Sequence, residues 1–138
     1  MFFNKKEKKN TETDLVKIGA LLIHTAKIDE NYSIDEEKII KKTLISLGAD
    51  KNNIDTIIKN AKKCEEDSNQ ILDFTREIKN LEEINKIKII KSLWKIIYSN
   101  NEADIYETNL MRRLAGLLYI DSKIMGDIKE EIKKENLK

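Results

Sequence analysis

Apolar residues recur along this chain three and four positions apart, the spacing that places them on one side of an α-helix. Such stripes run through residues 13–27, 34–47, 50–64 and 69–78, with polar residues filling the other side of each. The fourth stripe is short and carries only a few apolar positions. The pattern predicts four amphipathic helices in this part of the chain.

The segment from Leu81 to Ser99 is different, because apolar residues cover well over half of its circumference. It leaves a polar strip formed by Lys88, Lys91, Ser92 and Lys95. A helix that is apolar on most sides is the central helix of a bundle. We therefore expect Trp94 and Tyr98 to lie in the core rather than at a ligand.

Residues that favour the start or the end of a helix lie between these apolar stripes. Ser33, followed three residues later by Glu36, predicts a capping box in which each side chain binds the other residue's backbone N–H. Gly48 is expected to end that helix. The next two starts are predicted at Asp50, and at Ser68 or Asn69.

The last part of the chain carries the same kinds of signal. Asp104 with Glu107 predicts another capping box, at the start of a helix whose apolar stripe reaches Leu118. A final helix is expected from near Asp121, and its apolar stripe ends at Ile132.

One helix start is written twice at an offset of 71 residues, in 34–42 and again in 105–113, each after an acidic, Asn-rich loop. The matching pairs are Ser33 and Asp104, Glu36 and Glu107, Leu47 and Leu118, and Asp50 and Asp121. The repeat predicts an all-α fold, a single compact bundle of about seven helices built from two pseudo-symmetric halves. Residues 1–12 are expected to be a flexible N-terminal tail, and residues 13–136 one helical domain.

Composition narrows the function. The 138 residues are enough for one domain, and the lack of Pro and scarcity of Gly agree with an all-α chain. The net charge is +1 with the signs interspersed, so nucleic acid is not expected as a partner. One cysteine and one histidine exclude an intrachain disulfide and a cysteine zinc site. They also leave no nucleophile–histidine–acid arrangement, and no Gly-rich phosphate loop is visible.

His24 falls opposite its helix's apolar stripe and is expected in solvent or at a partner.

No membrane-spanning segment is expected, because the longest apolar run, Ile18 to Ile23, is far too short to cross a bilayer. The N-terminus lacks the apolar segment of a signal peptide, which favours a cytoplasmic location. Phe2 and Phe3 beside lysines allow a weak contact of the tail with a membrane surface.

The first acidic loop contains Asp29, Asn31 and Ser33 at alternate positions, which resembles the first half of a calcium-binding EF-hand loop. The second half of that motif fails. Ile34 stands where the sharp turn needs glycine, and Ile40 stands where the bidentate glutamate belongs. These two residues exclude a true EF-hand. A smaller cation site remains possible, in which loop oxygens combine with a carboxylate from the first turn of the next helix.

Glu36 and Glu107 fit that last role, since each lies at the centre of its helix's apolar stripe, where an unpaired carboxylate would be costly. One explanation is a cap, in which each binds the backbone at the start of its helix. The other is a divalent-cation site for Ca²⁺ or Mg²⁺. Its ligands would be Asp29, Asn31 and Glu36 in the first copy, or Glu102, Asp104 and Glu107 in the second.

These residues resemble the TerB family, known from tellurite-resistance operons and from stand-alone bacterial proteins. The family's motif has an alanine-rich helix end, an Asp-Gly loop, a Ser or Asp cap and glutamates before an apolar helix, which is similar to 26–37 and 93–118 here. The resemblance spans about residues 14–134. It departs from the family at Glu30 and Asn101, which replace the loop glycines, and at Asn100, which replaces the second Asp.

The resemblance implies an all-helical fold of two halves, a cytoplasmic location, and acidic loops suspected of holding divalent cations. It also implies a non-enzymatic module that serves a stress or metal response through protein partners, with a homodimer left open. A divalent-cation sensor is the alternative function. A hydrolase that uses a carboxylate-held metal is less favoured, because the chain has almost no histidine.

Overall fold

The computed structural model describes residues 11–28, 33–68, 70–100 and 105–136. Within them the chain is all-α, with no strand, as the sequence predicts. The elements are α1 (Glu12–Lys27), α2 (Ile34–Ser46), α3 (Ile54–Asp67), α4 (Leu72–Ile78), α5 (Glu83–Ile97), the 3₁₀ helix η2 (Tyr98–Asn100), α6 (Ile105–Leu117) and α7 (Ser122–Asn136). None of the described helices is long and apolar enough to cross a membrane.

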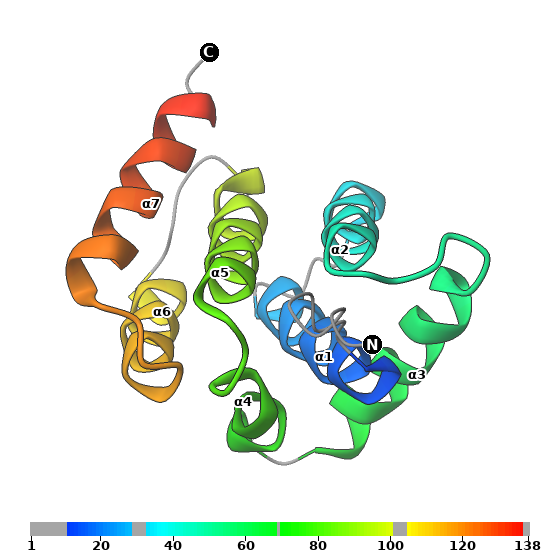
Figure 1. Cartoon of the computed structure of the whole chain (residues 1–138). Helices are drawn as coiled ribbons and strands as arrows, with labels where there is room; N and C mark the ends of the chain where they lie inside the picture. The colour runs from blue at the N-terminus through cyan, green and yellow to red at the C-terminus, as the bar shows by residue number, and fades with distance from the viewer. Residues whose placement is uncertain (1–10, 29–32, 69, 101–104, 137–138) are drawn as a thin grey trace, which may run out of the picture.

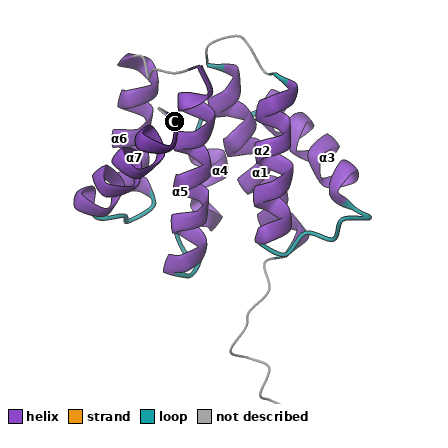
Figure 2. Cartoon of the chain, turned by 90° about the horizontal axis from the view of Figure 1, so that it is seen from above, coloured by secondary structure: helices purple, strands orange, loops and turns teal. Residues whose placement is uncertain are grey.

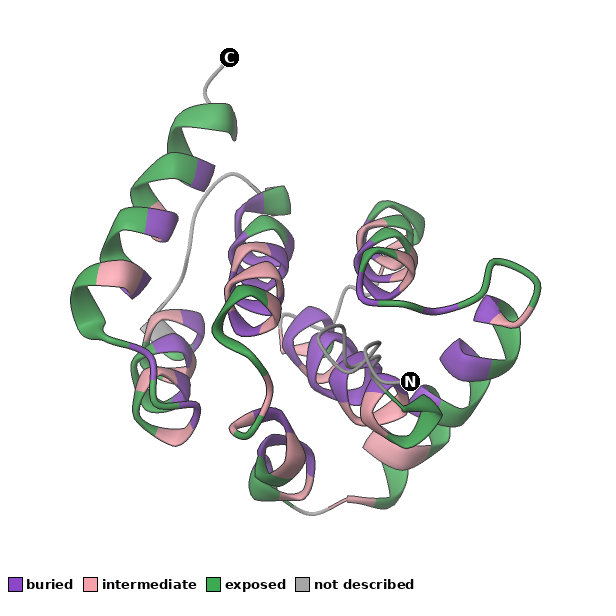
Figure 3. Ribbon diagram, in the orientation of Figure 1, coloured by how far each residue is buried: buried purple, intermediate pink, exposed green. Residues whose placement is uncertain are grey.

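Two helices, α1 and α5, form the centre of the bundle (Figure 1). Helices α2 and α3 lie on one side of this pair and α6 and α7 on the other, an arrangement also visible in Figure 2. Helix α1 packs against α3, α4, α5 and α2, and α5 packs against α1, α2 and α7. The predicted central role of the fifth helix is confirmed, since more than half of the residues of α5 are buried, Trp94 among them (Figure 3). Tyr98, in η2, is buried as well.

Local capping signals fold as the sequence predicts. The Ser33 backbone N–H donates to Glu36 Oε1 at 2.8 Å, and the Glu36 N–H donates to Ser33 Oγ at 3.1 Å. A similar capping box at the start of α1 joins Thr11 and Asp14. Both boxes satisfy backbone donors that have no partner inside the helix.

The ends of α2 and α6 repeat each other at the offset of 71. The Ala49 N–H donates to Leu44 O at 2.9 Å, and the Ile120 N–H donates to Ala115 O at the same distance. Both turns need a left-handed residue, Gly48 at φ 117° and Tyr119 at φ 59°. The next turns also correspond, because Asp50 and Asp121 each accept from the N–H two residues later at 2.9 Å. These matches are local, and pseudo-symmetry of the two whole halves stays a prediction.

Two predicted helix starts were wrong. Asp50 does not begin α3, because its carbonyl oxygen accepts from the Asn53 N–H in a turn, whereas the Asp121 carbonyl oxygen accepts from the Met125 N–H in the first bond of α7. The helix after Asp50 begins only at Ile54. Ser68 does not cap α4, because its hydroxyl donates back to Cys64 O at 2.8 Å at the end of α3. The alternative cap, Asn69, lies outside the described residues.

Replacing Gly48 with alanine is expected to lower the free energy of unfolding by about 1–2 kcal/mol. A φ of 117° is one that residues with a Cβ rarely adopt, so the substitution strains the turn even though the space around it is open. Urea denaturation would measure the loss. Gly116→Ala, at a helical glycine that also has open space, is the control and is expected not to destabilise. Equal effects of the two substitutions would contradict this account of the turn.

Candidate functional site

The two glutamates singled out by the sequence, Glu36 and Glu107, are buried at the first turns of α2 and α6. Their exposed fractions are only 2% and 4%. Glu36 confirms the predicted capping box through its bonds with Ser33. The cap that Asp104 was predicted to form with Glu107 lies outside the described residues.

Glu36 also connects the first half of the chain with the end of α5. The Ser99 hydroxyl, in η2, lies 3.3 Å from Glu36 Oε2 and 2.6 Å from the Ile96 carbonyl oxygen. Its single hydrogen is shared between these acceptors, and the shorter bond is the stronger. The contact places the start of α2 beside the residues that lead into the second acidic loop.

Glu107 acts on the same end of α5 through its charge. Tyr98 is buried and stacks on Trp94 with ring centroids 5.8 Å apart. Burial raises the pKa of the Tyr98 phenol, and the negative charges of Glu130 and Glu107 raise it further. Carboxylates from α6 and α7 therefore bear on the α5 end that also meets Glu36.

Four of the six predicted metal ligands, Asp29, Asn31, Glu102 and Asp104, lie outside the described residues. Among the residues that are described, no group of three or more His, Cys, Asp or Glu side chains could hold a metal ion. The divalent-cation site in the acidic loops therefore stays a prediction.

His24 does not point into solvent alone, contrary to the expectation from its helical position. Its Nδ1 lies 3.2 Å from Glu65 Oε2 on α3, and its ring centroid is 6.0 Å from that of Phe74 on α4. Lys27 Nζ donates to the other Glu65 oxygen at 2.7 Å. The side of α1 that carries His24 is therefore covered by α3 and α4. The spacing of apolar residues along α1 alone cannot predict contacts with other helices.

Glu65 is expected to stabilise the fold at neutral pH and to lose this effect in acid. Burial acts to raise the pKa of Glu65, but hydrogen bonds from Lys27 and His24 outweigh it and lower the pKa below its usual 4.5. A lowered folded pKa contributes stability above the unfolded value, which disappears as pH falls through the folded value. Glu65→Gln should therefore cost about 0.5–1 kcal/mol at pH 7 and less at pH 3.

Urea denaturation at both pH values would test this, with the exposed Asp67→Asn as a control that should change little. A cost of Glu65→Gln that stays the same from pH 7 to pH 3 would show that the carboxylate's charge is not its source.

The predicted polar strip of α5 faces α2 and lines a groove of about 390 Å³. The hydroxyls of Thr43 and Ser92 meet on its floor. Four lysines surround it, Lys42, Lys88, Lys91 and Lys95, and no carboxylate of the described residues lines it. Lys91 Nζ also lies 3.5 Å from Glu131 Oε2 of α7. The other three lysines still make this side of the α2–α5 contact basic, although the net charge of the chain is close to zero.

A model of the family described as Tellurite resistance protein TerB matches residues 15–130. The match begins in α1 and ends in α7, and so includes part or all of every described helix. Comparison with curated proteins and comparison with solved structures found no match.

Proposed function

The chain belongs to the TerB family, and from this premise we propose that it is a non-enzymatic helical module that acts through protein partners in a cytoplasmic stress or metal response. The family match, which covers most of the chain, carries the proposal. The scarcity of histidine supports the non-enzymatic part, since histidine is the residue that enzymes use most often for proton transfer.

A weak divalent-cation site in the acidic loops is part of the proposal. Support comes from Glu36 and Glu107, two buried carboxylates at helix starts that directly follow these loops. Oxygen ligands of this kind suit Ca²⁺ and Mg²⁺. Because Glu36 meets Ser99 beyond the end of α5, a bound cation would also bias how α2 packs on α5. That link favours a cation sensor as the second candidate function.

Calorimetric titration of the full chain with Ca²⁺, Mg²⁺ and Mn²⁺ tests the cation site. We expect saturable binding at millimolar metal and a higher melting temperature, since a ligand that binds only the folded state stabilises it. Glu36→Gln should weaken the binding about tenfold or more, because it removes a charged oxygen ligand.

Asp14→Asn is the matched control. Asp14 closes the equivalent capping box of α1 but does not follow an acidic loop. It should lose a similar amount of capping stability and leave metal affinity unchanged. The absence of heat and of any melting shift would exclude the cation site and the sensor. Unchanged affinity in a Glu36→Gln, Glu107→Gln double variant would show that other residues are the ligands.

The basic groove between α2 and α5 indicates the chemistry of a partner. Four lysines around one groove favour an acidic protein segment, whose charges would be attracted to them. Once a protein partner is identified, it can be immobilised and the chain passed over it at low salt. The double variant Lys42→Glu, Lys95→Glu should no longer be retained by the partner. The same reversal at the exposed Lys59 and Lys63 of α3 should have little effect. Equal retention by both double variants would exclude the groove as the docking surface.

A further inference from the structure

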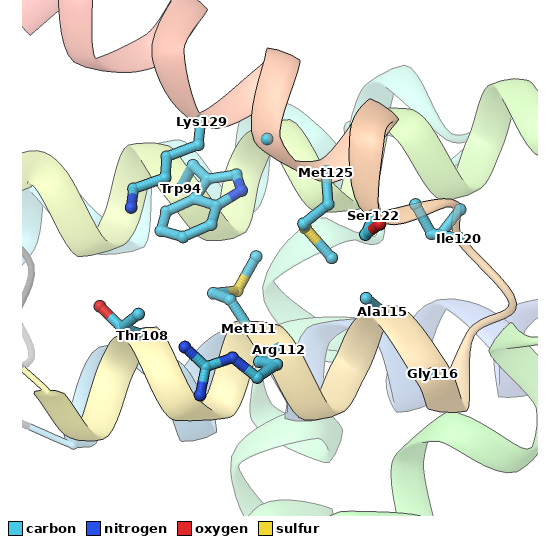
Figure 4. A pocket seen from close by; sticks show the side chains of 11 residues that line it. Trp94, Thr108, Met111, Arg112, Ala115, Gly116, Ile120, Ser122, Met125 and Lys129 are labelled. Atoms are coloured by element: carbon cyan, nitrogen blue, oxygen red, sulfur yellow. The ribbon is translucent and has the colours of Figure 1, made fainter.

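A second groove lies between α5, α6 and α7, on the side of the bundle away from α2. Its volume is about 460 Å³, within the range of sites that hold small organic ligands. Figure 4 shows Trp94 from α5 and Met125 from α7 facing Met111 from α6 across it. None of these residues belongs to the acidic loops, so the groove stands apart from the function proposed above.

Two helical glycines help to keep the groove open. Gly116 in α6 and Gly126 in α7 line it, and a Cβ added to either would meet nothing within 4 Å. Glycine inside a helix is unfavourable relative to alanine, and nothing packs against these positions to require it. Both positions leave room for a ligand where a larger side chain would fill the space.

Packing in this half of the bundle differs from that in the first half. Gly19 of α1 touches Ala61 of α3 so closely that an added Cβ would lie 2.9 Å from the Ala61 Cβ. The residues 71 positions later are Ile90 and Ile132, both buried. Accordingly, α7 packs less extensively on α5 than α3 packs on α1. The groove lies on the more loosely packed side.

Trp94 supplies a hydrogen-bond donor that the described residues leave unused. Only 2% of Trp94 is exposed, yet its Nε1–H has no acceptor among the described residues. It is the one buried side-chain nitrogen or oxygen in the described structure without a partner. A buried donor left unsatisfied costs free energy, so such a group in a native protein calls for an explanation.

The indole nitrogen is turned toward Met125 (Figure 4). Its own surface is covered, so an acceptor reaches it only when a neighbouring side chain moves. Methionine is suited to that movement because its side chain is unbranched and flexible. The groove can therefore admit a ligand oxygen to the nitrogen at the cost of a side-chain rotation.

The two charged side chains that line the groove are both cations. Lys129 Nζ lies 5.6 Å from the centre of the Trp94 ring, and within the described part of the chain Arg112 Nη1 makes a single long bond, of 3.4 Å, to Asn109 Oδ1. Arg112 and Lys129 are the charged residues among those that line the groove. Two cations beside an apolar cavity favour an occupant that is apolar and carries a negative charge.

We propose that the groove between α5, α6 and α7 binds an apolar monocarboxylate, such as a fatty acid of medium length. The hydrocarbon part packs on the methionines and the Trp94 ring, an oxygen of the ligand accepts the Nε1–H, and Arg112 and Lys129 offset the negative charge.

Trp94 is the only tryptophan in the chain, so its fluorescence reports directly on this groove. Titration of the full chain with sodium decanoate, below its micelle concentration, should change the emission saturably. Calorimetry on the same samples should give one site per chain. 1-Decanol, which has the same hydrocarbon tail and no charge, should bind about tenfold more weakly, as should decanoate to Trp94→Phe measured by calorimetry.

Gly126→Leu fills the groove and should abolish decanoate binding. Asp127→Leu adds the same side chain one position along α7, outside the lining, and should bind like the wild type. Gly126→Ala, a smaller change, should weaken binding even if the leucine variant does not fold. Equal affinity for decanoate and 1-decanol would overturn the proposal. So would unchanged affinity in a folded Gly126 variant, or a fluorescence change that never saturates.

Discussion

Leu93→Ala is expected to lower the free energy of unfolding by about 3–5 kcal/mol. Leu93 lies on the central helix α5 and is fully buried, so the substitution removes apolar contacts and leaves a cavity that the surrounding helices fill only in part. Chemical denaturation followed by circular dichroism would measure the loss. Ile84→Ala, on the same helix but 64% exposed, should change the stability by less than about 1 kcal/mol.

A companion variant tests whether the chain is one folding unit. Leu22 of α1, 71 positions before Leu93, is also fully buried, and α1 packs against α5. Leu22→Ala should cost a similar amount. In both variants the whole chain should unfold in one transition, because the two central helices share the core. Separate transitions, with each substitution shifting only one of them, would show that the halves fold independently.

Gly19→Ala is expected to destabilise the protein by about 1–3 kcal/mol, although alanine is the better helix former. An added Cβ would lie 2.9 Å from the Ala61 Cβ and 3.4 Å from Leu44 Cδ1. Both neighbours are buried side chains, and the Ala61 Cβ cannot turn aside. Helices α1 and α3 would have to separate, which disturbs the most extensive contact in the bundle.

Gly126→Ala is the matched control for this prediction, and its sign should be opposite. Its added Cβ meets nothing within 4 Å, so only the gain in helix propensity remains, about 0.5–1 kcal/mol. Thermal melting of the two variants and the wild type would show whether each substitution lowers or raises the melting temperature. Stabilisation by Gly19→Ala would show that α1 and α3 can separate without cost.

Features that depend on a few neighbouring residues could be predicted from the sequence. The Ser33–Glu36 capping box and the Gly48 stop follow from side chains acting on the backbone next to them. The central position of α5 could be predicted too, since a helix apolar on most sides needs neighbours on most sides. The family match agrees with the resemblance that these residues carry.

Features that join distant parts of the chain could not be predicted in this way. The contact of His24 with Glu65 spans 41 residues, and that of Ser99 with Glu36 spans 63. The groove at Trp94 depends on the distances between α5, α6 and α7. The apolar stripe of one helix does not predict those distances. Asp50 illustrates a local failure, because one residue type serves both as a helix cap and as a turn former.

The central pairing of α1 with α5 has a consequence for synthesis on the ribosome. The partners α2, α3 and α4 are all made before α5, so α1 can pack on them while the rest of the chain is still being translated. The side of α1 that meets α5 must wait for Ile97, the last residue of that helix. At about 5–20 residues per second, the roughly 20 residues from Ile78 to Ile97 take about 1–4 s. During that interval the nascent chain presents an apolar surface that a chaperone could recognise.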